Sequence, residues 1–498
     1  MSSLKLEFLT EEMEYLRPVL METRTGEETA ESIIPDSTPD ISEVLFTCGT
    51  AFLRGQELME GRASVSAGVS ASVLLQPEGQ AEPEVIEAYL PISLTFENSA
   101  IHSDLRGAST VFLERLESQL VNPRRILIRA SVRVTLKLWE PCREEHPVSA
   151  DAPGVETLLE VQPARLLSAM GEKRYSVEDT ARFPSEHVGK KLVSVQTQVE
   201  HSECRLTGTR AVFRGNLELS ALYLTHDGKL ETADAQLPFS QFIDLETCEE
   251  RDELQLDSIL CGADAELSAD GGGLNISAQI LSRAVVWSSR EIPCITDVYS
   301  CDGQAEPQWR EREYESLLDT QLFPVTGRAV LPDITGQEAA AVCLPGAWSH
   351  KREGEHVSFT LPVRIQLLTD GETGASPGTA RIELTCTTRA APECRFELEA
   401  TELHVQTSPG AEGSDVRLSG TLCLRTYGTT SFREVSECEI TEDETAGARP
   451  GLIIRRTCRG ERLWDIAKQY GSTREAIRSA NSLTEEPAEG TLLLIPGR

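Results

Sequence analysis

Apolar and polar residues alternate along most of the chain before the C-terminal tail. In the two clearest runs, 65–75 and 126–138, every second residue is apolar. Such alternation places one face of a strand on a core and the other in water, so it predicts antiparallel β-structure. Helical spacing is scarce before residue 460. Hairpin turns are expected at 226–229 and 270–273, where Asp and Gly separate apolar runs.

The predicted strands recur at a long and nearly constant interval. Residues 126–139 (ILIRASVRVTLKLW) align without a gap to 274–287 (LNISAQILSRAVVW) at an offset of 148, and both segments end in tryptophan. Residues 88–93 match 235–240 at an offset of 147. An interval this long excludes a solenoid, and short strands separated by turn signals are typical of β-sandwich modules. The sequence therefore predicts a repeated β-sandwich-like domain.

A third and more diverged copy is indicated by residues 365–371 followed by 416–424, in the same relative order. Alternation fails, and Pro, Glu and small residues accumulate, in three segments that we expect to be linkers: 140–171, 301–313 and 440–451. The predicted fold is mainly β, with three repeated β-sandwich-like domains followed by a small α+β domain of βααβ order. The expected domain bounds are 1–145 with an N-terminal extension, 172–300, 314–440 for the diverged copy, and 451–498.

The C-terminal tail has a different pattern. One face of a short helix is predicted by the apolar residues Leu463, Trp464, Ile466, Ala467 and Tyr470. Gly471 is expected to end this helix, and Thr473 to cap a second helix with Ile477 on its apolar side. A closing strand is predicted over 491–495. A core this small needs a large anchor, which we expect to be Trp464.

This tail resembles a LysM domain. The resemblance is carried by Gly460, Leu463, Trp464, Ile466, Ala467, Tyr470, Ala480, Asn481, Gly490, Leu493, Ile495 and Pro496. It implies a groove for N-acetylglucosamine polymers between the loop after the first strand and the loop before the second. Glu461 and Arg462 replace the short Asp-Thr pair of the family in that first loop, so the sequence favours a protein ligand over a sugar.

The resemblance implies which tail residues bind a ligand and which form the core of the domain. The expected partner- or glycan-binding residues are Gly460, Glu461, Arg462, Leu463, Asn481, Leu492 and Leu494. The expected core residues are Trp464, Ile466, Ala467, Tyr470, Ile477, Leu493 and Ile495.

Alternation turns Leu492 and Leu494 outward in the closing strand, and two explanations stay open. Either a partner protein or the third sandwich covers these leucines, or they are ordinary exposed residues of a small sheet. The same choice applies to the tail arginines, which either dock an acidic partner or face the acidic remainder of the chain or solvent. These arginines are Arg455, Arg456, Arg459 and Arg462.

The repeated domains resemble the SPOCS domain of spore-coat proteins through 34–41 (IPDSTPDI), 222–224 (LYL) and 237–243 (LPFSQFI). Three such domains followed by a LysM domain resemble the SipL-type spore-coat morphogenetic proteins. The resemblance implies a sporulation scaffold without catalytic activity, located in the mother-cell cytoplasm at the forespore surface and in the spore coat. It also implies that the LysM domain binds a SpoIVA-like coat morphogenetic ATPase, together with other coat proteins. The alternative is a peptidoglycan-binding protein of the spore cortex or cell wall.

Composition narrows the classes of function. The chain has 498 residues and a formal charge of −33, and such an acidic surface would repel phosphate backbones, which argues against nucleic-acid binding. We expect no transmembrane segment and no secretory leader. Residues 451–498 carry eight Lys and Arg against six Asp and Glu, or +2, which leaves −35 on the rest of the chain.

No motif for catalysis stands out. The eight histidines form no metal-binding motif and are expected mostly on the surface or in loops. The thirteen cysteines include no C-x-x-C pair, so we expect reduced thiols in place of a disulfide framework. Asp36 and Asp40 are flanked by prolines, which favours turn roles over catalysis. The sequence therefore predicts no enzyme activity, no catalytic residue, no cofactor and no metal.

Overall fold

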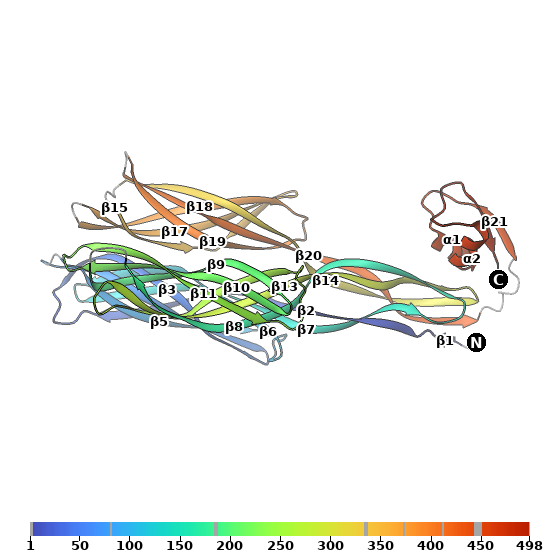
Figure 1. The fold of residues 1–498 in the computed structure, drawn as a ribbon, viewed down its shortest axis with the longest axis horizontal. Helices are drawn as coiled ribbons and strands as arrows, with labels where there is room; N and C mark the ends of the chain where they lie inside the picture. The colour runs from blue at the N-terminus through green and yellow to red at the C-terminus, as the bar shows by residue number, and fades with distance from the viewer. Residues whose placement is uncertain are drawn as a thin grey trace.

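The structure is a computed structural model that describes residues 3–79, 82–183, 188–332, 337–371, 374–410, 413–442 and 451–497. Strands make up most of the described residues, which confirms the mainly β prediction. The molecule is elongated, with the broad sheets at one end and long two-stranded ribbons reaching toward the other end (Figure 1).

The described strands before residue 443 fall into three successive units. The first unit consists of β2 (Phe8–Ile33), β3 (Ile41–Met59), β4 (Arg62–Pro77), β5 (Glu84–Glu97), β6 (Arg106–Asn122) and β7 (Arg125–Ala150). The second consists of β8 (Val155–Arg182), β9 (Gly189–Thr207), β10 (Arg210–Thr225), β11 (Leu230–Asp244), β12 (Glu253–Leu267) and β13 (Gly273–Ser300). The third consists of β14 (Gly303–Leu331), β15 (Gln337–Pro345), β16 (Ser349–Glu353), β17 (His356–Gly371), β18 (Gly374–Arg389), β19 (Arg395–Gly410) and β20 (Gly413–Glu442).

Each unit contains two antiparallel sheets with the same strand order. The sheets are β2-β7-β6 and β3-β4-β5 in the first unit, and β8-β13-β12 and β9-β10-β11 in the second. In the third they are β14-β20-β19 and β15-β17-β18, with β16 also paired to β17. The inward-facing apolar residues of the two sheets form a core in each unit, and the core of the first unit also includes Cys261 and Leu281 of the second. Val65, Val132 and Leu136 are among the residues with no exposed surface in the first core.

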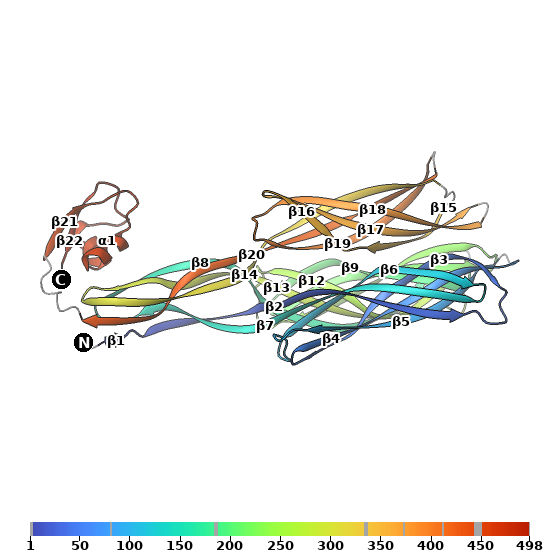
Figure 2. The same ribbon diagram turned by 180° about the vertical axis from the view of Figure 1, so that it is seen from behind.

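The first and last strands of each unit continue beyond the sheets as a two-stranded ribbon, and the ribbons lie side by side (Figure 2). The linker expected over 140–171 is therefore wrong, because only 151–154 interrupts β7 and β8. Most of 301–313 likewise belongs to β14. Apart from residues 439–441 of β20, which also pair with a short N-terminal strand, each ribbon strand has one open edge. An open edge accepts prolines and exposed charges that a central strand excludes. The linker expected over 440–451 lies mostly outside the described residues.

Two β-bulges recur at corresponding positions in the three ribbons. The first leaves one residue unpaired opposite Trp139, Trp287 or Tyr427, and the unpaired residues are Val19, Ser168 and Leu318. The second leaves one residue unpaired in the last strand of each unit, and these residues are Val148, Thr296 and Ser436. A bulge changes the twist of a strand, so the shared positions give the three ribbons the same local geometry.

The ribbons join through apolar side chains that come from all three units. Leu16, Trp287 and Tyr427 belong to one such cluster, and Tyr15, Ile292 and Tyr314 belong to the next one along the ribbons. The short strand β1 (Ser3–Lys5) also pairs with β20, so the N-terminal segment lies on the third ribbon. The ribbons therefore form one packed body.

The residues after 450 form a small module, called the C-terminal module below, at the ribbon end of the molecule (Figure 1). Its elements are β21 (Leu452–Arg456), α1 (Leu463–Tyr470), α2 (Arg474–Asn481) and β22 (Leu492–Pro496). Gly471 ends α1 in the left-handed region at φ 59°, and the Thr473 hydroxyl accepts a hydrogen bond from the Ala476 N–H at the start of α2. The fully buried side chains include Leu463, Ile466, Ala467, Ile477, Leu493 and Ile495.

Candidate functional site

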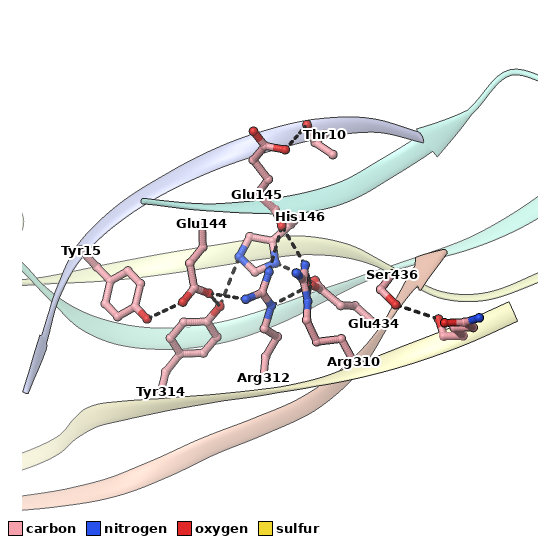
Figure 3. A network of polar contacts seen from close by, with 11 residues as sticks. Thr10, Tyr15, Glu144, Glu145, His146, Arg310, Arg312, Tyr314, Glu434 and Ser436 are labelled. Atoms are coloured by element: carbon pink, nitrogen blue, oxygen red, sulfur yellow. Dashed lines mark hydrogen bonds and ion pairs between the residues drawn. The ribbon is translucent and has the colours of Figure 1, made fainter. Parts of the chain in front are cut away.

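A buried polar network joins the first and third ribbons (Figure 3). Glu434 of β20 has no exposed surface and lies 2.7 Å from His146 Nδ1 of β7. It also accepts hydrogen bonds from Arg310 at 2.6 Å and Arg312 at 2.7 Å, both of β14. Burial by itself would raise the pKa of Glu434, but the hydrogen bonds from His146 and the two arginines lower it to about 2. The carboxylate therefore holds the two ribbons together in its ionised form.

The same network continues through Glu144 of β7. Its carboxylate accepts hydrogen bonds from the Tyr15 hydroxyl at 2.9 Å, the Tyr314 hydroxyl at 2.8 Å and Arg312 at 2.8 Å. Burial, with the Glu144 charge, raises the pKa of both tyrosines, so both hydroxyls remain donors at neutral pH. These contacts join β2 and β7 of the first ribbon to β14 of the third. The carboxylate, hydroxyl and guanidinium groups of the network bind one another.

Two histidines are exceptions to the prediction that most of them lie on the surface or in loops. His146 is only 1% exposed in the network. His201 of β9 has both ring nitrogens buried in the second unit, where its ring packs edge-on against Phe213 and Phe239. His187 lies outside the described residues. Sequence reasoning missed the site of His146 because its partner Glu434 lies 288 residues away in the chain.

The C-terminal module docks on the tip of the second ribbon through Trp464. The indole Nε1–H donates to Asp297 at 2.8 Å, and the ring meets Tyr299 edge-on at 4.8 Å between centroids. Lys468 binds Asp297 at 2.7 Å, and the Tyr299 hydroxyl donates to the Ser472 carbonyl at 2.8 Å. Trp464 is therefore an anchor of the docking contact as well as a core residue of the module.

Opposite charges extend this docking contact. Arg474 pairs with Glu156 at 3.3 Å and donates to the Thr157 carbonyl at 3.0 Å. Arg462 reaches Glu160 at 3.5 Å. Basic residues of the module therefore face acidic residues of the second ribbon. Of the two explanations for the tail arginines, Arg462 follows the one in which an arginine faces the acidic remainder of the chain.

Polar groups of the expected binding set are engaged inside the module. Glu461 forms an ion pair with Arg455 and accepts a hydrogen bond from the Cys458 N–H at 2.8 Å. Asn481 donates to the Leu494 carbonyl at 2.6 Å and accepts from its N–H at 2.7 Å. A ligand that bound these groups would have to displace contacts that hold the module together.

The remaining residues of that set are divided between the loop and the sheet. Gly460 has a φ of 78° in the loop before α1, a conformation that favours glycine. Leu463 is fully buried, and its N–H donates to Glu486 at 2.6 Å. Leu492 and Leu494 lie on the outer face of the sheet. The structure therefore does not gather the expected binding residues in one place.

The outer face of the β21–β22 sheet is apolar and exposed. Its large side chains are Leu452, Ile454, Leu492 and Leu494, which are 55%, 62%, 60% and 36% exposed. The third unit does not cover them, whereas Leu493 and Ile495 on the other face have no exposed surface. Sequence reasoning identified only the two leucines of β22, although the alternation in 452–456 (LIIRR) carries the same signal. We call these four side chains the apolar face.

The described residues were also compared with the requirements of a metal site, a reactive thiol and a membrane span. No three His, Cys, Asp or Glu side chains among the described residues are grouped so as to hold a metal ion. Burial raises the pKa of the thiols of Cys48, Cys294 and Cys386 to about 11, so they remain protonated at neutral pH. Neither α1 nor α2, the helices of the described residues, has the length and apolar character needed to cross a membrane.

One comparison with known proteins gives a match. Residues 190–267 match the family model described as SipL, SPOCS domain. The matched stretch runs from β9 to the end of β12 in the second unit. No curated protein and no solved structure matches the chain. This part of the second unit is therefore similar to the SPOCS domain of the SipL family.

Proposed function

We propose that the protein is a scaffold of spore-coat assembly without enzymatic activity, and that its C-terminal module docks a basement-layer coat protein. A SpoIVA-like ATPase at the forespore surface is the proposed partner, and the module is proposed to be a LysM domain. The family match over 190–267 supports the link to the spore coat. The apolar face of the module is the observation that carries the docking function.

Exposure of these side chains is costly unless a partner covers them. Fully burying one leucine or isoleucine contributes about 1.5–3 kcal/mol relative to exposure. The apolar face holds four such side chains on one small sheet, and contiguous apolar surface of this kind typically marks a protein interface. The ribbon tip occupies the α1 side of the module, so the apolar face remains accessible in the docked arrangement.

Direct binding assays test this proposal. The double variant Leu492→Ser and Leu494→Ser should lower the affinity for the purified SpoIVA-like ATPase at least tenfold, because two contact side chains become polar. The matched control is Leu9→Ser with Leu322→Ser, two leucines that are 64% and 66% exposed outside the module. Circular dichroism should be unchanged in both variants. Undiminished binding by the module variant, with the control also normal, would refute docking through this face.

The alternative function is binding of peptidoglycan in the cortex or cell wall, and the LysM resemblance of the tail favours it. The internal contacts of Glu461 and Asn481 argue against a free sugar groove. Sedimentation with purified peptidoglycan separates the two functions. We expect the full chain to stay in the supernatant. Sedimentation that is lost on deletion of 451–498 would favour the glycan function instead.

A further inference from the structure

The basic residues of the C-terminal module differ in whether they have an acidic partner. Five of them form ion pairs: Arg455 with Glu461, Arg462 with Asp465 and Glu160, Lys468 with Asp297, Arg474 with Glu156, and Arg478 with Glu486. Arg456 and Arg459 are exposed and form no ion pair within the described part of the chain. Two positive charges of the module are therefore left uncompensated.

Arg456 lies at one end of the apolar face. Arg456 ends β21 and stands opposite Leu492 in the sheet register. Strand alternation places Leu452, Ile454 and Arg456 on the same outer face, because each is exposed while Ile453 and Arg455 between them are less so. Arg459 follows in the loop after β21. The apolar face thus has a basic end.

The rest of the chain has the opposite charge. With a formal charge of −33, two copies of the chain repel each other over long range, which disfavours self-association through this small face. A partner that covers four apolar side chains and two unpaired arginines needs apolar side chains with carboxylates at one end. Arginine pairs well with carboxylates, since its planar group donates two parallel hydrogen bonds.

We propose that the apolar face, with Arg456 and Arg459, binds an apolar segment of the partner protein that carries acidic residues at one end. This inference rests on the proposed docking function and specifies the chemistry of the bound segment. The apolar contacts supply most of the affinity, and the two arginines fix the direction in which the segment lies and speed its association.

Charge reversal tests this inference. The double variant Arg456→Glu and Arg459→Glu should weaken binding to the purified SpoIVA-like ATPase about tenfold, since it removes the attraction to the acidic residues of the segment and adds repulsion. Binding by the unmodified chain should weaken as sodium chloride rises, and binding by this variant should not. The matched control is Arg129→Glu with Arg417→Glu, which makes the same change in net charge at exposed positions in the first and third units.

The outcomes separate this inference from the docking function itself. If the serine variants at Leu492 and Leu494 lose binding but charge reversal has no effect, docking through the apolar face stands and the acidic segment is refuted. Equal loss in the arginine control variant would also refute it, because net charge alone would then explain the effect. Sedimentation velocity of the chain alone should show monomers. A dimer that charge reversal dissociates would assign the face to a second copy and overturn the inference.

Discussion

Replacing Glu434 with glutamine removes the charge at the centre of the network that joins the first and third ribbons. The pKa of this buried carboxyl falls from an ordinary value of 4.5 to about 2 in the folded protein, which corresponds to about 3 kcal/mol of stability at neutral pH. Removing one partner of a buried charge pair typically costs about 3–5 kcal/mol. We therefore expect Glu434→Gln to lower the free energy of unfolding by about 3 kcal/mol.

Urea unfolding followed by circular dichroism measures this loss, and the same strand offers a control. Glu437 is half-exposed and pairs with Lys5 at 3.1 Å, so Glu437→Gln should cost less than about 1 kcal/mol. The effect of Glu434→Gln should also depend on pH. A carboxyl with a lowered pKa stabilises the fold above its unfolded pKa, and this stabilisation is lost as pH falls from about 4.5 toward 2. Equal losses in the two variants, or a difference that does not change with pH, would refute the assigned role of Glu434.

Two further predictions concern His201 and the docking of the C-terminal module. Burial lowers the pKa of His201, so the unfolded chain binds the proton more readily and stability should fall as pH drops below about 6.5. His201→Phe should reduce that fall in thermal unfolding between pH 7 and pH 5; an unchanged pH profile would contradict it. Asp297→Ala leaves the Trp464 Nε1–H without its acceptor, which should loosen the module by about 1–3 kcal/mol. Hydrogen exchange should then accelerate in α1, whereas unchanged protection would show that other contacts hold the module.

The strands could be predicted from the sequence because alternation reports directly which side of a strand is buried. Val65, Val132 and Leu136 occupy such positions and are fully buried. In 140–171, charged residues and prolines break the alternation, so the sequence predicts a linker there. In the structure this segment is strand apart from 151–154, and its buried polar residue His146 has its partner in another unit. His146 lies 288 residues before Glu434 in the chain.

In the candidate site, too, the sequence predicts local features but not contacts between residues that are distant in the chain. Spacing and alternation within the tail placed Trp464 in the core and turned Leu492 and Leu494 outward, because both properties depend on neighbouring residues. The contact of Trp464 with Asp297 could not be predicted, since it joins residues 167 positions apart. The pairing of individual arginines also depends on how the module sits on the ribbon, so the sequence left their roles open.

The second bulge places His146, Cys294 and Glu434 at corresponding positions, each two residues before the bulged residue. All three side chains are buried where the ribbons meet. In a symmetric trimer of three identical chains, the same residue would occupy this position in every chain. A buried acid there would then lie close to two other buried acids. Fusion of the three units into one polypeptide removes that constraint. One copy can then supply a base, another an acid and the third a small neutral thiol, and only one arrangement of the units satisfies them.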